Sequence, residues 1–188
     1  DDSSEHELHE VMPHLSTRNY VGVAPRGGVD TPGERNSFLW NQQPDEVSTA
    51  AEGVHRAIER AKRRFHVDPQ QIFLAGFGSG GEMALRLALA TPESYAGVVS
   101  INGPLPRGRN PLGQLKSVRR LPVMLVAGLE SDFYPQERVC GDLRLLHAAG
   151  VKLQIVHLPT GDELTTSILR TMNQWIMQQI CDKQTICR

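Results

Sequence analysis

Short runs of apolar residues recur along the chain, and none of them contains Asp, Glu, Lys or Arg. The runs lie at residues 19–24 (NYVGVA), 72–77 (IFLAGF), 97–101 (GVVSI), 122–127 (PVMLVA) and 153–158 (LQIVHL). Each has the length of a typical strand, and strands that are apolar on both faces are typical of parallel sheets covered on both sides. The pattern therefore predicts a buried strand at each run.

Between the runs, apolar positions recur with three- and four-residue spacing, which predicts amphipathic helices. The helical stretches run from Leu8 to Leu15, Val47 to Phe65, Met83 to Ala88, Val139 to Leu146 and Leu164 to Ile176. Ser4-Glu5-His6-Glu7 has the form of a capping box at the start of the first helix. The predicted fold class is α/β, a three-layer α/β/α sandwich with a mostly parallel sheet and a site beyond the carboxyl ends of its strands.

Length and composition narrow the class of protein. The 188 residues predict one domain over residues 1–188, with an ordered core at about residues 4–180 and a polar tail at residues 181–188. A formal net charge of −1 gives no overall attraction to nucleic acid, and no apolar run approaches the roughly 20 residues of a membrane span. The three cysteines fit neither a disulfide framework nor a metal site, so a reducing, cytoplasmic compartment is expected.

One local charge imbalance bears on ligand binding. Residues 104–121 contain no acid and these bases: Arg107, Arg109, Lys116, Arg119 and Arg120. Solvated surface is the simplest interpretation of this basic stretch. If the basic stretch borders the crevice at the sheet edge, it favours an anionic ligand.

Residues 71–84 (QIFLAGFGSGGEMA) combine an apolar run, a cluster of glycines and the start of a helix. This segment resembles the nucleophile elbow of α/β hydrolases. Three further landmarks follow the order of the phospholipase/carboxylesterase family: APRG at residues 24–27, GLESDFYP at residues 128–135 and HLPTGDEL at residues 157–164. The resemblance covers most of the chain and implies an α/β-hydrolase fold.

The resemblance also assigns the positions of a catalytic triad. The family's G-x-S-x-G elbow corresponds to residues 76–80 (GFGSG), so the nucleophile position holds Gly78. The acid position holds Asp132, and the position of the family's histidine base holds Asp162. Two of the three positions are therefore replaced. Because a carboxylate cannot relay the serine proton as an imidazole does, impaired ester hydrolysis is expected.

Substitutes for the missing groups remain open. Ser79 is one residue beyond the nucleophile position, but it is also predicted to cap the next helix, as the first residue of Ser79-Gly80-Gly81-Glu82. His157 is a substitute base only if its loop doubles back. Asp132 and Asp162 are a pair of carboxylates that, if they face each other, need a proton, an Arg or Lys, or water between them. No metal and no cofactor are predicted.

In the family, a central strand precedes the first helix of this chain, and the loop after it donates one oxyanion-hole amide; the other donor is the N–H at Ser79. We therefore expect an N-terminal segment or a second chain to complete the sheet. Three functions follow as hypotheses: a catalytically impaired pseudo-hydrolase that binds a small ester or anionic ligand, an active serine esterase using Ser79, or an interaction module completed by another chain.

Overall fold

The computed structural model describes residues 8–16, 18–30, 38–108 and 112–186. It divides into two compact units, residues 1–69 and residues 70–188, and each is considered by itself. The expected capping box at residues 4–7 lies outside the described residues. Among the residues described, none of the helices has the length and apolar character needed to cross a membrane.

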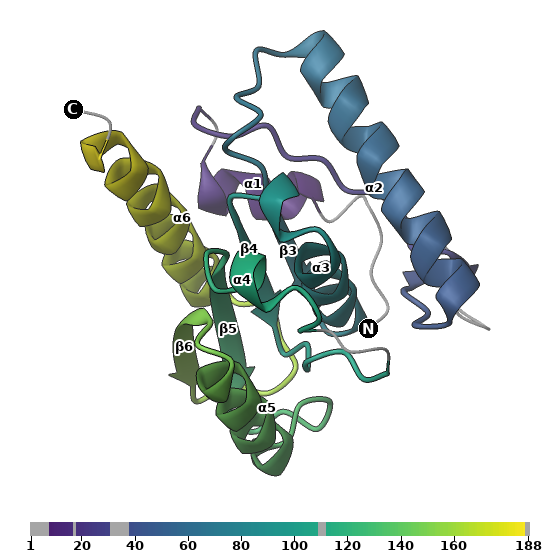
Figure 1. The fold of residues 1–188 in the computed structure, drawn as a ribbon, viewed down its shortest axis with the longest axis vertical. Coiled ribbons are helices and arrows are strands. Elements are labelled where there is room, and N and C mark those ends of the chain that lie inside the picture. Colours follow the sequence, from purple (N-terminus) through teal and green to yellow (C-terminus); the bar gives the residue numbers. More distant parts are fainter. Residues whose placement is uncertain (1–7, 17, 31–37, 109–111, 187–188) are drawn as a thin grey trace. The chain divides into compact units, whose positions relative to one another are not determined.

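The first unit contains two helices and a small hairpin (Figure 1). Helix α1 spans Leu8–Leu15 and helix α2 spans Pro44–Arg64, as the helical spacing predicts. The ends of α2 carry charges that suit its dipole, with acids in the first turn and bases in the last. Strands β1 (Val29–Asp30) and β2 (Phe38–Leu39) pair antiparallel and were not predicted, because two-residue strands leave no periodic pattern.

The strand predicted at residues 19–24 is wrong. These residues have no regular secondary structure, and Val21 and Val23 are 44% and 46% exposed. A β-strand is defined by ladder hydrogen bonds to a neighbour, and none of the strand pairs in the described residues includes this segment. An apolar run therefore indicates a tendency to be extended, but it forms a strand only where a neighbouring strand is available to pair with it.

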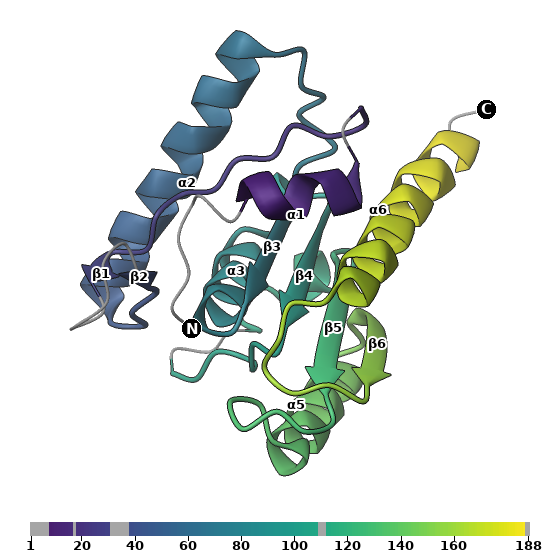
Figure 2. The same ribbon diagram turned by 180° about the vertical axis from the view of Figure 1, so that it is seen from behind.

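The second unit is a four-stranded parallel sheet with helices on both sides (Figures 1 and 2). Its strands are β3 (Phe73–Phe77), β4 (Gly97–Ile101), β5 (Pro122–Gly128) and β6 (Lys152–Leu158), in the order β3-β4-β5-β6. The helices are α3 (Ser79–Ala90), the single turn η2 (Pro92–Ser94), α4 (Leu115–Val118), α5 (Gln136–Ala148) and α6 (Thr166–Ile186). The predicted α/β sandwich with a mostly parallel sheet is confirmed.

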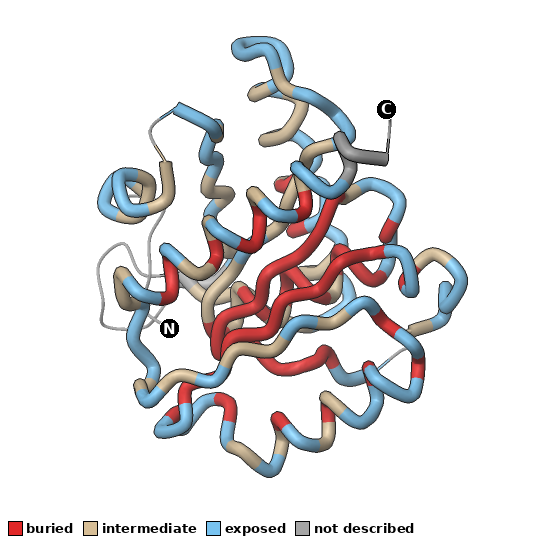
Figure 3. Tube along the Cα trace, turned by 90° about the vertical axis from the view of Figure 1, so that its left-hand side faces the viewer, coloured by how far each residue is buried: buried red, intermediate tan, exposed pale blue. Residues whose placement is uncertain are grey.

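Burial is concentrated on the two central strands. Every residue of β4 and β5 is buried, whereas the edge strands β3 and β6 are only partly buried (Figure 3). On one face, Val98, Val123 and Leu125 belong to an apolar cluster that includes residues of α3 and α5. On the other face, α6 contacts β4 and β5. Alternation of side chains along each strand thus gives the sheet two apolar faces.

Helix α6 differs from the prediction at both ends. Leu164 was placed on the helix but precedes it and is 36% exposed. The helix continues to Ile186, across residues predicted to form a polar tail. On α5, Cys140 is exposed.

Candidate functional site

The carboxyl ends of the four parallel strands meet at one edge of the sheet. Backbone hydrogen bonds continue across this edge after the strands end. The N–H of Gly78 donates to the carbonyl of Ile101 at 2.8 Å, and the N–H of Asn102 donates to that of Val126 at 2.8 Å. The segments that follow β3, β4, β5 and β6 are therefore held side by side, and residues 78, 102, 128–133 and 160–162 form the candidate site.

Gly78 makes the turn between β3 and α3. Its dihedral angles are φ 54° and ψ −121°, and it is the N-cap of α3. Its carbonyl accepts a hydrogen bond from the N–H of Glu82 at 3.1 Å. A positive φ is strained for a residue with a Cβ but accessible to glycine. Gly78 therefore occupies a backbone position at which a residue with a side chain would be strained.

The predicted capping role of Ser79 is wrong. Gly78 holds the N-cap position, Ser79 is the first residue of α3, and α3 has no side-chain cap hydrogen bond. A capping side chain must stand on the last residue before the helix, where the backbone is not helical. Ser79 is one position too late and is half-buried.

Close backbone packing fixes the start of α3 against β3 and β4. A Cβ added to Gly76 would lie 2.2 Å from the carbonyl oxygen of Gly80, and one added to Gly81 would lie 2.6 Å from Ser100 Oγ. Ser100 is buried and donates from Oγ to the carbonyl of Gly103 at 2.7 Å. Packing requires glycine at both positions, since a larger residue would push the Gly78 turn away from the sheet edge.

Asp162 is the most heavily hydrogen-bonded side chain of the site. Its Oδ1 accepts from Ser131 Oγ at 2.5 Å and from Asn102 Nδ2 at 3.1 Å. Its Oδ2 accepts from the backbone N–H groups of Asp132 at 3.0 Å and Phe133 at 3.2 Å. One carboxylate thus joins the loop after β6 to the loop after β5 and to the end of β4.

If the carboxylates of Asp132 and Asp162 faced each other, they were expected to need a proton, an Arg or Lys, or water between them. The structure brings the two residues together in a different way, because Asp162 receives the backbone N–H of Asp132, and its other donors are also uncharged. Backbone and hydroxyl donors stabilise a carboxylate without a counter-charge. The side chain of Asp132 is exposed, and that of His157 is exposed on β6, opposite Ala127 in the register.

Asn102 and Ser131 are site residues that the sequence did not reveal. Asn102 is 1% exposed and has φ 49°, a value that Asn tolerates better than most residues. Its Nδ2 also donates to the carbonyl of Gly161 at 2.9 Å, and its Oδ1 accepts from the N–H of Gly128 at 2.8 Å. Ser131 Oγ accepts from the N–H of Tyr134 at 2.9 Å while it donates to Asp162. An Asn directly after a buried strand was the available signal.

A buried polar cluster supports the site from the side of α5. Asp142 Oδ2 accepts from Tyr134 Oη at 3.0 Å and from the N–H of Leu105 at 2.8 Å. Burial, and then the neighbouring Asp142, raise the pKa of Tyr134 above its usual range, so the phenol keeps its proton. Burial also raises the pKa of Glu82, on the first turn of α3, against the opposing effect of Arg138.

The basic stretch does not border the site as a whole. Arg119 and Arg120 precede β5 by a few residues, at the amino end of that strand, whereas the site lies at the carboxyl ends. Arg119 Nε donates to the carbonyl of Ala149, next to the end of α5, at 2.9 Å. Arg107 follows β4 and is exposed, and Arg109 lies outside the described residues. The basic stretch was expected to favour an anionic ligand only if it bordered this edge of the sheet, and Arg119 and Arg120 do not border it.

Comparison with known proteins identifies relatives over most of the chain. The model of the phospholipase/carboxylesterase family matches residues 30–178. Carboxylesterase SOBER1 of Arabidopsis thaliana is 22% identical over 170 residues, which cover 88% of this chain and 73% of that protein. Acyl-protein thioesterase 1 of Gibberella zeae is 24% identical over 153 residues, which cover 77% of this chain and 65% of that protein.

Several curated relatives extend well beyond the matched region. The chain spans 17% of the bifunctional acetylxylan esterase/xylanase XynS20E of Neocallimastix patriciarum, and 50% and 53% of two further plant relatives. Whole-protein activities of these relatives therefore carry over to this chain only as proposals.

Solved structures share the fold. The crystal structure of Arabidopsis thaliana SOBER1 has a TM-score of 0.72 at 18% identity, covering 95% of this chain and 94% of that one. The carboxylesterase from Mesorhizobium loti has a TM-score of 0.75 at 16% identity, covering 93% and 83%. Together with the family match over residues 30–178, this likeness places the chain in the phospholipase/carboxylesterase family, with the α/β-hydrolase fold.

Proposed function

We propose that this protein binds a ligand at the carboxyl edge of its sheet and does not hydrolyse esters through a serine triad. The observation that carries the proposal is the set of four hydrogen bonds accepted by Asp162, the residue at the position of the family's histidine base. The carboxylate is occupied by donors from two neighbouring segments, so it serves as a structural acceptor.

Ester hydrolysis by this family needs a nucleophilic oxygen and a base that can move its proton. Gly78, at the nucleophile position in the strained turn, has no side chain to supply that oxygen. The two substitutions support each other, because a proton-relaying base is of no use without a nucleophile. Glycine also removes the strain that serine would bear at φ 54°.

The ligand that suits the edge best is an uncharged ester. Asp132 and Asp162 bring negative charge to the site, and Arg119 and Arg120 lie at the other end of β5. A carboxylate ligand would be repelled by these acids. Leu129, 49% exposed, and Phe133, 40% exposed, lie on the same loop as Asp132 and add apolar surface. A binding or regulatory role thus replaces turnover.

The proposal is tested by hydrolysis of p-nitrophenyl acetate with the full chain, next to Ser79→Ala and Gly78→Ser. We expect wild type and Ser79→Ala to show the same rate as the uncatalysed ester. Gly78→Ser should also stay at background, because Asp162 still holds the base position. Turnover by wild type that disappears in Ser79→Ala would overturn the proposal and identify a serine esterase with a shifted nucleophile.

Binding is measured separately by ligand-observed NMR with phenyl acetate and with acetate. Phenyl acetate should give a saturable signal that is at least fivefold weaker in Phe133→Ala, whereas acetate should give none. Equal binding of both compounds would contradict an uncharged ligand, and identical signals from wild type and Phe133→Ala would contradict this site.

A second candidate function is completion of the sheet by another segment. Among the described strands, β3 pairs only with β4 and is therefore an edge strand, and edge strands accept added strands. If a second copy supplies the strand, the Tm should rise by several degrees between micromolar and hundred-micromolar protein. A Tm independent of concentration, with a monomeric mass throughout, would exclude pairing between copies.

A further inference from the structure

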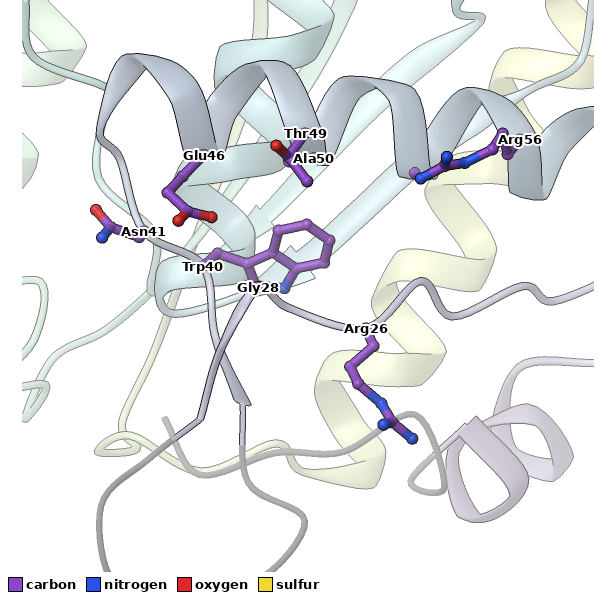
Figure 4. A pocket seen from close by; sticks show the side chains of 9 residues that line it. Arg26, Gly28, Trp40, Asn41, Glu46, Thr49, Ala50 and Arg56 are labelled. Atoms are coloured by element: carbon purple, nitrogen blue, oxygen red, sulfur yellow. The ribbon is translucent and has the colours of Figure 1, made fainter.

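A cavity of about 120 Å³ lies in the first unit against helix α2. Its lining includes Arg26, Trp40, Glu46, Ala50, Gly53 and Arg56 (Figure 4). All of these residues come from the first unit, and none belongs to the site at the sheet edge. We propose that this cavity binds a small carboxylate with a single flat apolar ring.

The size of the cavity limits the ligand to about one ring. Engineered cavities of about 150 Å³ in other proteins hold a benzene molecule, and the space here is about 120 Å³. Trp40 is half-buried, and its indole lies beneath Thr49 and Ala50 of α2 (Figure 4). An indole face is a favourable surface for another flat ring.

Charges at opposite ends of the cavity give the ligand a direction. The side chain of Arg56 extends along α2 toward the indole, and the carboxylate of Glu46 lies on the opposite side of the indole (Figure 4). A guanidinium holds a carboxylate through two parallel hydrogen bonds, whereas Glu46 repels it. A bound carboxylate therefore points toward Arg56 and away from Glu46, with its ring against Trp40.

Gly53 leaves open space on the wall of the cavity formed by α2. A Cβ built on Gly53 meets no atom of the described residues within 4 Å beyond its chain neighbours and the adjoining backbone of α2, so packing there does not require a glycine. Glycine inside a helix lowers stability relative to alanine, and it allows a ligand to approach the backbone closely. Gly141 on α5 also has an open Cβ position, but it lies outside this cavity and provides a matched control.

The test uses the full chain with Trp175→Phe, which leaves Trp40 as the single tryptophan of the sequence. Benzoate should change the fluorescence of Trp40 in a saturable way, with a Kd of about 1–10 mM for a ligand of this size. Benzamide, which has the same ring without the charge, should bind at least fivefold more weakly. Saturation-transfer NMR with the unsubstituted protein checks that Trp175→Phe has not altered binding.

Four substitutions locate the binding. Arg56→Gln should weaken benzoate binding at least fivefold, whereas Arg60→Gln, an exposed arginine of the same helix outside the lining, should leave it unchanged. Glu46→Gln should tighten binding, because it removes the repulsion. Gly53→Leu should abolish binding by filling the cavity, and Gly141→Leu should not.

The proposal is overturned if benzoate gives no saturable signal up to about 20 mM, or if benzamide binds as tightly as benzoate. It is also overturned if Arg56→Gln and Arg60→Gln have the same effect. Should Gly53→Leu fail to fold, the opposite signs expected for Arg56→Gln and Glu46→Gln still decide the matter.

Discussion

At Asp162, one carboxylate connects two loops that follow different strands. Its Oδ2 receives consecutive N–H groups from Asp132 and Phe133, and its Oδ1 receives the Ser131 hydroxyl and the Asn102 amide. Hydrogen bonds to an ionised acceptor are stronger than those between neutral groups. The residue is exposed as a whole, so water can replace part of this interaction when the carboxylate is removed.

Asp162→Ala should destabilise the protein by about 1–3 kcal/mol, because its donors lose a charged acceptor. Urea denaturation measures this loss as a lower midpoint with an unchanged m-value. Glu163→Ala removes the neighbouring exposed carboxylate and should change the free energy of unfolding by less than about 0.5 kcal/mol. Equal effects of the two substitutions would show that the hydrogen bonds of Asp162 do not stabilise the loops.

Asn102 contributes through its side chain and through its backbone. Asn102→Gly and Asn102→Ala both remove the hydrogen bonds to Gly128, Gly161 and Asp162, but only alanine places a Cβ at φ 49°. Asn102→Ala should therefore be about 1 kcal/mol less stable than Asn102→Gly. Thermal unfolding of both variants measures the difference, and an alanine variant at least as stable as the glycine variant would contradict a strained backbone.

At the scale of elements, the apolar pattern predicted the secondary structure of those segments whose backbone hydrogen-bonding partners are present. Helix α2 and strands β3, β4, β5 and β6 closely match the predicted ranges, because a helix bonds to itself and each of these strands has at least one neighbour. The run at residues 19–24 is also mostly apolar but forms no strand. The local pattern of a segment shows only that it prefers an extended backbone. The hydrogen-bond ladder of a strand also depends on a partner that is distant in the sequence.

The contact between β4 and α6 depends on a glycine. A Cβ added to Gly97 would lie 2.9 Å from the ring of Trp175 and 3.1 Å from that of Phe73, and these two rings meet edge to face at 6.1 Å. Gly97→Ala should destabilise the protein by about 1–3 kcal/mol through overpacking. In a double-mutant cycle, Trp175→Phe should recover part of that loss, and strict additivity would show that the ring is not the obstacle.

At the scale of the whole molecule, the site illustrates which information a sequence holds. Gly78, Asp132 and Asp162 were predicted as site residues because the order of the family's landmarks is visible along the chain. The hydrogen bonds that hold this edge together join Asn102 to Gly161 across 59 positions and Ser131 to Asp162 across 31. Such pairs leave no spacing pattern, so their partners became visible only once the strands were aligned.

Glu82 should make the stability of the molecule depend on pH. Burial raises the pKa of Glu82, so the folded state binds the proton more tightly than the unfolded state. The stability that this proton adds is complete below the unfolded pKa of about 4.3. It is lost as the pH rises through the pKa of the folded state. Glu82→Gln mimics the protonated form and should raise the Tm at pH 7 by about 1–2 °C, with the gain shrinking toward pH 4.

Glu59→Gln is the control of opposite sign, because the hydrogen bond from Lys62 lowers the pKa of Glu59 and its loss cannot stabilise the protein. A Tm gain for Glu82→Gln that is the same at pH 4 and pH 7 would exclude the charge of Glu82 as its cause.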